Sequence, residues 1–530
     1  MAKPESTKET ITSINPATLE TLGEVEITPP EEVEGIVQKA WEAFPKWRDT
    51  GLKERATRIR NVQQLLLERN EDIARLITQE MGRPLTESLV LEVQASLDLT
   101  GYYAKRARSF LDDRRVPLHH LLFMRRKSTM HHEPLGILGI ISPWNWPLLI
   151  PMGGIIPALL SGNAVVFKHS ELTPLTAVKI QNLFSDAGIP EGIFQIVQGG
   201  SEIGKALVGS SIEKIFFTGS TEVGKEVLRQ ASHTLKKSVL EMGGSDPAIV
   251  CDDADLDITS SGLIWGGFSN CGQNCNGIER VYVHEKIADR LIALMTEKIQ
   301  RIRIGNGMDQ ETDMGPLASE AQRIKMEAII EMAVEMGAEV TLGGRRIDRT
   351  GYFFEPTLIR WDKSLLQPMD IEIFGPIIYY TPVSDDEEAV RLANRSKFGL
   401  AASVWTENPK RGNAIARRIE AGTVMINDSI VSFGMPEAGW TGIKNSGIGW
   451  VHGGKGLDEM VNIKYINRET QSHTQKLWWF PYSEGMIRGM KAALVFLFSK
   501  NPWKKTASIP RVLQSFTSYL LFNRKRNDKL

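Results

Sequence analysis

The sequence predicts an α/β protein built on parallel strands that helices cover. From residue 136 onward, short apolar runs alternate with stretches of helical periodicity. Each run has the length and the apolar character of a buried strand: GILGIIS, NAVVFK, IFQIVQG, KIFFTGS and DPAIVCD. Because the segments between them can supply crossover helices, the alternation favours a parallel sheet with helices on its faces.

Helices are expected before this block, and further strands and helices after it. Residues 31–81 place apolar side chains three and four positions apart, which predicts helices. A second block of strands and helices runs from about residue 255 to 427, and the glycine-rich segment GWTGIKNSGIGWVHGGKG follows it. A chain of 530 residues exceeds what a single core holds, so we expect two or more domains.

The cysteine content and the polar start of the chain indicate a reducing compartment. Three cysteines cannot build a disulfide framework in a chain this long. The start, MAKPESTKET, does not resemble a signal peptide, and no apolar run reaches the length of a membrane span. We therefore expect a cytoplasmic protein. We also expect no nucleic-acid partner.

Two glycine-rich turns connect a strand to a helix. VQGGSEIGKAL contains Gly199, Gly200 and Gly204, and FFTGSTEVGKEV contains Gly219 and Gly224. Small residues at a helix N-terminus let backbone N–H groups approach a pyrophosphate. Neither turn matches GxGxxG, so a tight turn without a ligand stays an open alternative for each.

Cys271 and Cys275 lie four residues apart in FSNCGQNCNG. A structural zinc site needs about four ligands, and no second cysteine pair or nearby histidine supplies them. A redox pair usually has two residues between its cysteines, whereas this pair has three. The small polar neighbours suit an exposed nucleophile on a turn better than a packed core cysteine. We therefore expect no metal here and favour a nucleophile.

The motifs around these cysteines resemble those of the aldehyde dehydrogenase superfamily. FSNCGQNC is similar to its active-site signature, and LEMGGSDP, at 240–247, is similar to its glutamate motif. Glu241 and Cys275 also keep the 34-residue separation typical of the family. Further motifs occur in family order between about residues 15 and 467: ISPWNWPLL, VVFKHSELTP, FTGSTEVG, EIFGP, FGLAASVWT and AGTVMIN.

The resemblance implies oxidation of an aldehyde to a carboxylic acid with NAD, or with NADP as the alternative. Cys275 would attack the carbonyl carbon, and the Asn145 amide with the Cys275 backbone N–H would stabilise the oxyanion. Glu241 would activate the water that hydrolyses the thioester. CoA-acylating relatives commonly lack this glutamate, so hydrolysis is favoured over a CoA-acylating reaction. A fold that has kept little activity and acts as a membrane-peripheral interaction protein is the second alternative.

The same resemblance assigns cofactor residues. Lys168 and Glu171 would bind the adenosine ribose, where a carboxylate repels a 2′-phosphate and so favours NAD. Gly219, Ser220 and Gly224 would form the pyrophosphate turn. The remaining cofactor residues would line the cleft or hold the nicotinamide and its ribose: Ile141, Trp144, Glu372 and Phe374.

The implied fold has three domains. A Rossmann-like coenzyme domain would comprise residues 1–115 and 134–243, and an α/β catalytic domain residues 244–455. A small β-extension, 116–133 with 456–467, would join subunits into a homodimer or homotetramer.

The sequence departs from the family pattern at one position close to the site. The Arg-Glu pair that commonly follows GIKNSG in the family is replaced by Trp450 and Val451, so the second carboxylate of the proton route is absent. His452 could substitute for it, or be purely structural.

Residues 468–530 form a basic tail beyond the family pattern. From residue 466 to the end, 12 Lys and Arg stand against 3 Asp and Glu, which gives +9 in a chain whose net charge is −1. Two stretches carry a helical apolar stripe: Met486, Met490, Leu494 and Leu497, then Ile509, Val512, Leu513, Phe516 and Leu520. Basic residues and tryptophans flank the stripes, so residues 477–526 suit peripheral membrane contact. The alternative is that the two helices cover the body of the protein, an interface between subunits or the substrate entrance. Membrane contact would fit a medium- or long-chain apolar aldehyde as the substrate.

Overall fold

The computed structural model describes residues 9–119, 123, 126–362, 371–470, 476, 479, 480, 482 and 484–527; for residues 516 and 518–527 it describes only the backbone. Residues 471–475, 477, 478, 481, 483 and 528–530 of the predicted tail therefore lie outside the described residues, as do residues 120–122, 124 and 125 of the predicted extension. The chain divides into two compact units: residues 1–112 with 131–464, and residues 113–130 with 465–530.

The larger unit begins with a hairpin and a group of helices. Strands β1 (Thr10–Ile14) and β2 (Thr21–Glu26) pair antiparallel. The predicted helices of residues 31–81 are confirmed, and a π-helical turn and a further helix follow them: α1 (Val33–Arg48), α2 (Leu52–Glu68), α3 (Asn70–Met81), η2 (Ser88–Gln94) and α5 (Ala95–Leu111). Their buried faces carry the apolar side chains whose spacing predicted them, including Val33, Val37, Ile59 and Val62.

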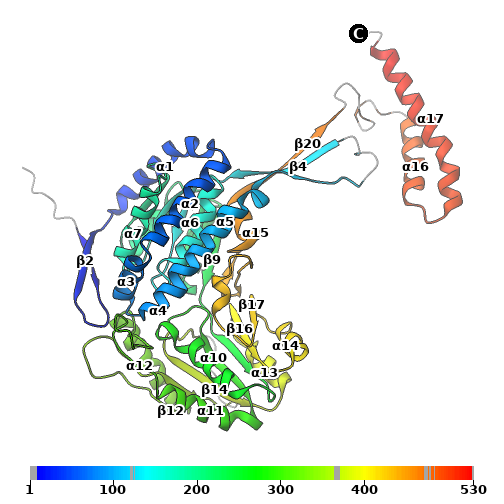
Figure 1. Ribbon diagram of the computed structural model, residues 1–530. Helices are drawn as coiled ribbons and strands as arrows, with labels where there is room; N and C mark the ends of the chain where they lie inside the picture. The colour runs from blue at the N-terminus through cyan, green and yellow to red at the C-terminus, as the bar shows by residue number, and fades with distance from the viewer. Residues whose placement is uncertain are drawn as a thin grey trace, which may run out of the picture. The chain divides into compact units, whose positions relative to one another are not determined.

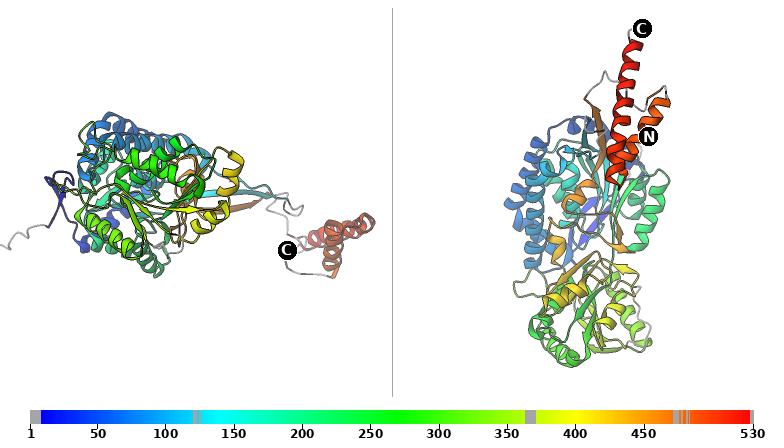
Figure 2. Two further views of the ribbon diagram at one scale, coloured as in Figure 1. Left: turned by 90° about the horizontal axis from the view of Figure 1, so that it is seen from below. Right: turned by 90° about the vertical axis from the view of Figure 1, so that its right-hand side faces the viewer.

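A six-stranded sheet forms the first lobe of this unit. Its order is β19-β9-β8-β5-β6-β7, and all pairs are parallel except β19 with β9. Helices lie on both of its faces (Figure 2). The strands are β5 (Ile137–Ile141), β6 (Ala164–Lys168), β7 (Phe194–Val197), β8 (Lys214–Gly219), β9 (Lys237–Met242) and β19 (Gly447–Ile448), and the helices between them are α6 (Leu149–Leu160), α7 (Pro174–Asp186), α8 (Ser201–Gly209) and α9 (Thr221–Ser232).

The strand order of this sheet reverses at β5. The chain runs outward through β6 and β7, returns to β8 on the other side of β5, and continues to β9. The carboxyl ends of β5 and β8 therefore flank a topological switch point, where open α/β sheets bind ligands. Strand β19 belongs to a segment that we assigned to the catalytic domain, but its backbone pairs with β9, with Gly447 opposite Glu241.

A seven-stranded sheet forms the second lobe (Figure 1). Its order is β12-β13-β14-β11-β10-β16-β17, and β12 is its only antiparallel member among the described strands. Its strands are β10 (Asp246–Val250), β11 (Ile278–His284), β12 (Glu339–Leu342), β13 (Thr357–Arg360), β14 (Ile377–Val383), β16 (Ala401–Trp405) and β17 (Thr423–Ile426). The accompanying helices are α10 (Leu256–Phe268), α11 (Glu285–Ile299), α12 (Glu320–Glu335), α13 (Asp386–Ala393) and α14 (Pro409–Ala416). Helix α15 (Gly453–Asp458) instead packs against α5 and α6 of the first lobe.

A three-stranded sheet and two helices complete the chain. The sheet has the order β20-β4-β3, from Val461–Glu469, Arg126–Pro134 and Arg114–Arg115. The two predicted tail helices are confirmed as α16 (Glu484–Phe498) and α17 (Pro502–Asn527). Both are too short or too polar to cross a bilayer, and so is every other helix in the described part of the chain. The domain limits given above stay a prediction.

Candidate active site

Cys275 lies on a turn between α10 and β11 whose backbone is unusual. Asn270 and Cys271 both adopt left-handed conformations, with φ of 50° and 55°, and Gly272 follows at 70°. A Cβ on Gly272 would lie 2.2 Å from the Gly375 carbonyl oxygen, so only glycine fits there. Cys271 is buried in the core of the second lobe, whereas Cys275 is half-buried and lines two cavities. The structure thus separates the two cysteines by environment, and both are free thiols.

Hydrogen bonds anchor this turn to Asn145. The Asn145 side-chain amide donates to the Gln273 carbonyl at 3.0 Å. The Asn145 carbonyl in turn accepts from Arg83 Nη2 at 2.8 Å and from Asn270 Nδ2 at 3.1 Å. Arg83 is fully buried and also pairs with Glu92, at 3.2 Å. Arg83 was not singled out in the sequence, because a buried arginine on a helix-linking turn has no local pattern.

One cavity opens at the switch point of the first sheet and holds most of the predicted site residues. Its volume is about 930 Å³. Trp144 and Asn145 reach it from the end of β5, Gly219 and Ser220 from the end of β8, and Glu241 from the end of β9. Glu372, Phe374 and Cys275 enter from the second lobe. The strand ends of one lobe and the loops of the other therefore share a single space.

The nicotinamide-side residues contact one another. The rings of Trp144 and Phe374 meet edge to face at 5.5 Å. Glu372 accepts the Gly244 N–H at 3.3 Å, and burial raises its pKa to about 8, with neighbouring Glu279 adding to the effect. Glu279 accepts the backbone N–H groups of Ile373 and Phe374 at 2.8 and 3.0 Å. Glu279 therefore fixes the loop that carries both predicted residues.

Four predicted cofactor residues do not line this cavity. Ile141 and Lys168 are partners at the ends of β5 and β6, and Lys168 Nζ lies 3.4 Å from Glu171 Oε2. Burial lowers the pKa of Lys168, while Glu171 remains exposed. Gly224 lies in the first turn of α9, where a Cβ would approach Met242 Sδ to 2.3 Å, so it permits close packing of helix on strand. Ser220 caps the same helix by accepting the Val223 N–H at 3.4 Å.

The cavity also has the chemistry to hold a dinucleotide. Buried polar atoms without a hydrogen-bond partner among the described residues face it: Thr218 Oγ1, Glu241 Oε1 and Gln322 Oε1. The N-terminus of α9, where Gly219 and Ser220 lie, offers free N–H groups to an anion. Thr218, Gln322 and Lys325 were missed by sequence reasoning. Thr218 stands in the FTGSTEVG motif but was not singled out there, and Gln322 and Lys325 stand in no motif that was recognised.

The titratable groups beside Cys275 are shifted by burial. Burial raises the pKa of the Cys275 thiol well above its ordinary range, and the Glu241, Glu372 and Asp246 carboxylates add to the effect. Burial likewise raises the pKa of Glu241 to about 8, against the opposing effect of a hydrogen bond from Trp440. The resting site therefore holds a neutral thiol next to a carboxyl group that titrates close to working pH.

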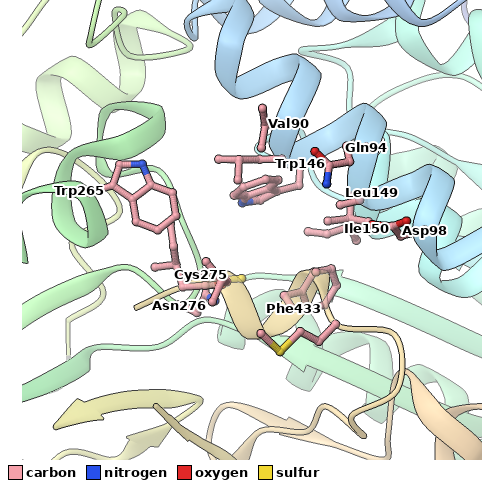
Figure 3. Close-up of a pocket in the computed structure, with 16 residues that line it drawn as sticks. Val90, Gln94, Asp98, Trp146, Leu149, Ile150, Trp265, Cys275, Asn276 and Phe433 are labelled. Atoms are coloured by element: carbon pink, nitrogen blue, oxygen red, sulfur yellow. The ribbon is translucent and has the colours of Figure 1, made fainter. Parts of the chain in front are cut away.

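A second cavity, of about 840 Å³, shares Cys275 with the first. Figure 3 shows the side chains that line it. Its walls are apolar side chains from four segments, including Leu91, Trp146, Leu149, Trp265 and Phe433. Gln94 and Asp98, both exposed, lie at its outer end. Among the described residues that line it, Asp98 is the only one with a charge, and none is cationic. No group of histidine, cysteine or acidic side chains in the described part of the chain could hold a metal ion.

An α/β fold with a ligand cavity at its switch point and a cysteine facing that cavity is the arrangement expected of a nucleotide-dependent oxidoreductase with a covalent mechanism. Residues 2–466 match the aldehyde dehydrogenase family. The chain is 36% identical over 460 residues to succinate-semialdehyde dehydrogenase of Oryza sativa, with 86% of each protein covered. It is 35% identical over 473 residues to betaine aldehyde dehydrogenase of Bacillus subtilis, covering 88% of this chain and 95% of that one.

Solved structures agree. The NAD+ complex of betaine aldehyde dehydrogenase from Staphylococcus aureus superposes with a TM-score of 0.85 at 32% identity, covering 91% of this chain and 96% of that one. The chain therefore belongs to the aldehyde dehydrogenase family and is an NAD(P)-dependent enzyme that oxidises aldehydes. The family match ends at residue 466, before α16 and α17.

Proposed function

We propose that the enzyme oxidises neutral, apolar aldehydes to carboxylic acids with NAD, through a thioester on Cys275 that water hydrolyses. One observation carries this proposal. Cys275 lies where an apolar cavity with no cationic lining residue among those described meets the cavity that contains Glu241. A substrate chain in the apolar cavity would place its carbonyl carbon at Cys275 Sγ, with Glu241 on the opposite side.

Carbon–sulfur bond formation would begin the reaction. Cys275 Sγ bonds to the aldehyde carbon as the thiol proton passes to solvent water, and the carbonyl oxygen becomes an oxyanion. The Asn145 amide and the Cys275 backbone N–H stabilise that charge, and one such donor contributes about 3–4 kcal/mol in other enzymes. Support comes from the hydrogen bonds of Arg83 and Asn270, which hold the Asn145 backbone before substrate arrives.

NAD, when bound, supplies the hydride acceptor. Trp144 and Phe374 would confine the nicotinamide, and Glu372 would bind its ribose, which favours transfer from the carbon bound to Cys275. Glu171 would accept from the adenosine ribose hydroxyls, and its carboxylate is the reason for preferring NAD to NADP. The thioester that remains on Cys275 must then be cleaved.

Glu241 is suited to activate the water for this step. Its Oε1 faces the cavity with no partner among the described residues, and its pKa of about 8 means that it can act as a base once the pH approaches that value. Water gives its proton to Glu241 and its oxygen to the acyl carbon, the C–S bond breaks, and the acid leaves with the thiol restored. This carboxylate favours hydrolysis over acyl transfer to CoA.

The aldehyde cavity favours neutral substrates. The distal carboxylate of succinate semialdehyde would find no cationic partner among the described lining residues, and Asp98 would repel it. An alkyl chain would bury against Trp146, Trp265 and Leu149, where each methylene gains about 0.8 kcal/mol. Chain length should therefore raise affinity until the cavity is filled.

We expect kcat/KM to increase about threefold to fourfold per methylene from butanal to hexanal, as that transfer energy implies. The kcat/KM for butanal should exceed that for succinate semialdehyde, which has the same number of carbon atoms, by about tenfold or more. NADH formation measures both ratios. Asp98→Asn should raise kcat/KM for succinate semialdehyde selectively, and most clearly at low salt. Asp72 is an exposed acidic residue on α3, and Asp72→Asn should leave this kcat/KM unchanged. A preference for succinate semialdehyde in the unaltered enzyme would overturn the assignment.

The β-extension supports self-association. Strand β20 lies at the edge of its sheet and exposes Ile463, Tyr465 and Ile466, an unprotected edge that a second copy would cover. We infer a homodimer or homotetramer joined through this strand.

The tail supports contact with an anionic membrane surface. Helices α16 and α17 pack as a hairpin, with Gly489 close to Ser515. Large apolar side chains remain exposed on the hairpin, with Trp503 83% accessible: Ile487, Met490, Leu494, Phe498, Trp503 and Leu513. Lysines and arginines flank them, as in helices that lie in a membrane interface.

Deleting residues 476–530 should abolish co-sedimentation with vesicles that contain phosphatidylserine while leaving NADH formation from butanal within about twofold. Light scattering on the full chain and on the shortened chain shows whether the edge of β20 or the α16–α17 hairpin joins the subunits. An unchanged number of subunits assigns self-association to β20, whereas a fall to the monomer would show that the tail is a subunit seam. Vesicle binding that survives the deletion would contradict the membrane role.

A further inference from the structure

We propose that Trp440 is a positioning residue for Glu241: its indole N–H holds one carboxylate oxygen and leaves the other directed at water in the cavity. The inference rests on the proposed role of Glu241 as the base. It also bears on how the site works without the second carboxylate common in the family, whose position Val451 occupies.

The contact is short and buried. Trp440 Nε1 donates to Glu241 Oε2 at 2.7 Å, the length of a charge-assisted hydrogen bond. Trp440 is 2% exposed and Glu241 is 5% exposed, and both line the cavity that contains Cys275. Glu241 Oε1 has no hydrogen-bond partner in the described part of the chain. One oxygen is thus fixed and the other is left for a ligand.

The donor type matters for the chemistry. An indole N–H can donate but cannot accept, so Trp440 cannot receive the proton that Glu241 takes from water. It can orient the carboxylate, and a hydrogen bond to the ionised form favours that form. The effect opposes the burial that holds the carboxyl group protonated. Trp440 therefore keeps a deeply buried carboxyl usable as a base.

The glycine-rich segment that departs from the family pattern holds Trp440 in place. Trp440 and Val451 exchange backbone hydrogen bonds of 2.7 and 2.8 Å. Phe433 packs edge to face on the indole at 5.3 Å. Gly447 of the same segment pairs with the Glu241 backbone in the sheet. The segment 440–451 therefore positions both the main chain and the carboxylate of Glu241.

His452 does not take this position. Its ring packs against Phe433 in a tilted arrangement with centroids 4.7 Å apart, and burial lowers its pKa to about 4, which keeps it neutral near pH 7. Glu241 Oε2 receives the Trp440 N–H, and Oε1 has no described partner, so neither oxygen bonds to the His452 ring. The structure favours the structural role for His452 and assigns the contact with Glu241 to Trp440.

Trp440→Phe tests this by removing the N–H and keeping an aromatic ring. Nitrophenyl acetate acylates Cys275 without hydride transfer, and nitrophenolate release after the initial burst reports hydrolysis of the acyl-enzyme. We expect this rate to fall about tenfold at pH 7 and its rising pH limb to move up by about one unit. The rate should recover to within about threefold above pH 9.5, with the KM for butanal unchanged.

Two controls make the outcome specific. Trp450→Phe changes the same residue type in the same segment, but Trp450 contacts Lys455 rather than Glu241, so its pH profile should not move. In a Glu241→Gln background, Trp440→Phe should lower the hydrolysis rate by less than about a further twofold, because the two residues act as one unit. An unshifted Trp440→Phe profile with Glu241→Gln inactive would overturn this inference alone. A fully active Glu241→Gln enzyme would instead refute the proposed base.

Discussion

Replacing Cys275 by alanine is expected to remove NADH formation almost entirely, by about 10⁴-fold or more, because no other nucleophile could form the covalent intermediate. Cys271 is buried in the core of the second lobe, and Cys251 is buried against α13 and its neighbours. Neither lines the cavities that meet at Cys275. The measurement is steady-state NADH formation from butanal, with cofactor binding followed separately to show that the site remains intact.

Cys271→Ala is the matched control for this experiment. It lies four residues away on the same turn, and its removal should cost about 1–2 kcal/mol of stability through a small cavity while preserving turnover. Loss of turnover in Cys271→Ala equal to that in Cys275→Ala would show that the turn, and not the Cys275 thiol, is what the reaction needs. Substantial activity in Cys275→Ala would eliminate the covalent route.

Five strands of the two sheets were predictable because they are buried along most of their length. Such strands read as continuous apolar runs, so β5, β6, β7, β8 and β10 were found within a residue or two of their ends. Strand β19 was not found, because two residues inside a glycine-rich segment carry no periodicity. It joins the first sheet only because β9 offers an antiparallel edge, a long-range effect.

The candidate site shows the same division between local and long-range information. Cys275, Asn145 and Glu241 stand in motifs, and the structure brings all three to one cavity. Trp440 contacts Glu241 across 199 residues of sequence, and nothing around a tryptophan in a glycine-rich segment announces such a partner. The charge of the aldehyde cavity was equally hidden, since Asp98 enters it from a helix that reads as ordinary surface.

Replacing Glu241 by glutamine should separate the two halves of the reaction. The amide preserves shape and can still accept a hydrogen bond from Trp440, but it cannot remove a proton from water. We expect about one equivalent of NADH to form rapidly per site, followed by a steady state reduced about 10²–10⁴-fold, the usual contribution of a general base. Mass spectrometry of the intact protein should then show the acyl group on Cys275.

The pH dependence gives an independent check. In the unaltered enzyme, burial raises the pKa of Glu241 to about 8, so the carboxyl group is mostly protonated and inactive as a base below that pH. The hydrolysis rate should rise with pH through about 8 and level off above it. Glu241→Gln should lack this rising limb, leaving only the gradual increase due to hydroxide. If the limb persisted in the variant, another group would have to be the base, and if no acyl-enzyme accumulated, hydrolysis would not depend on Glu241.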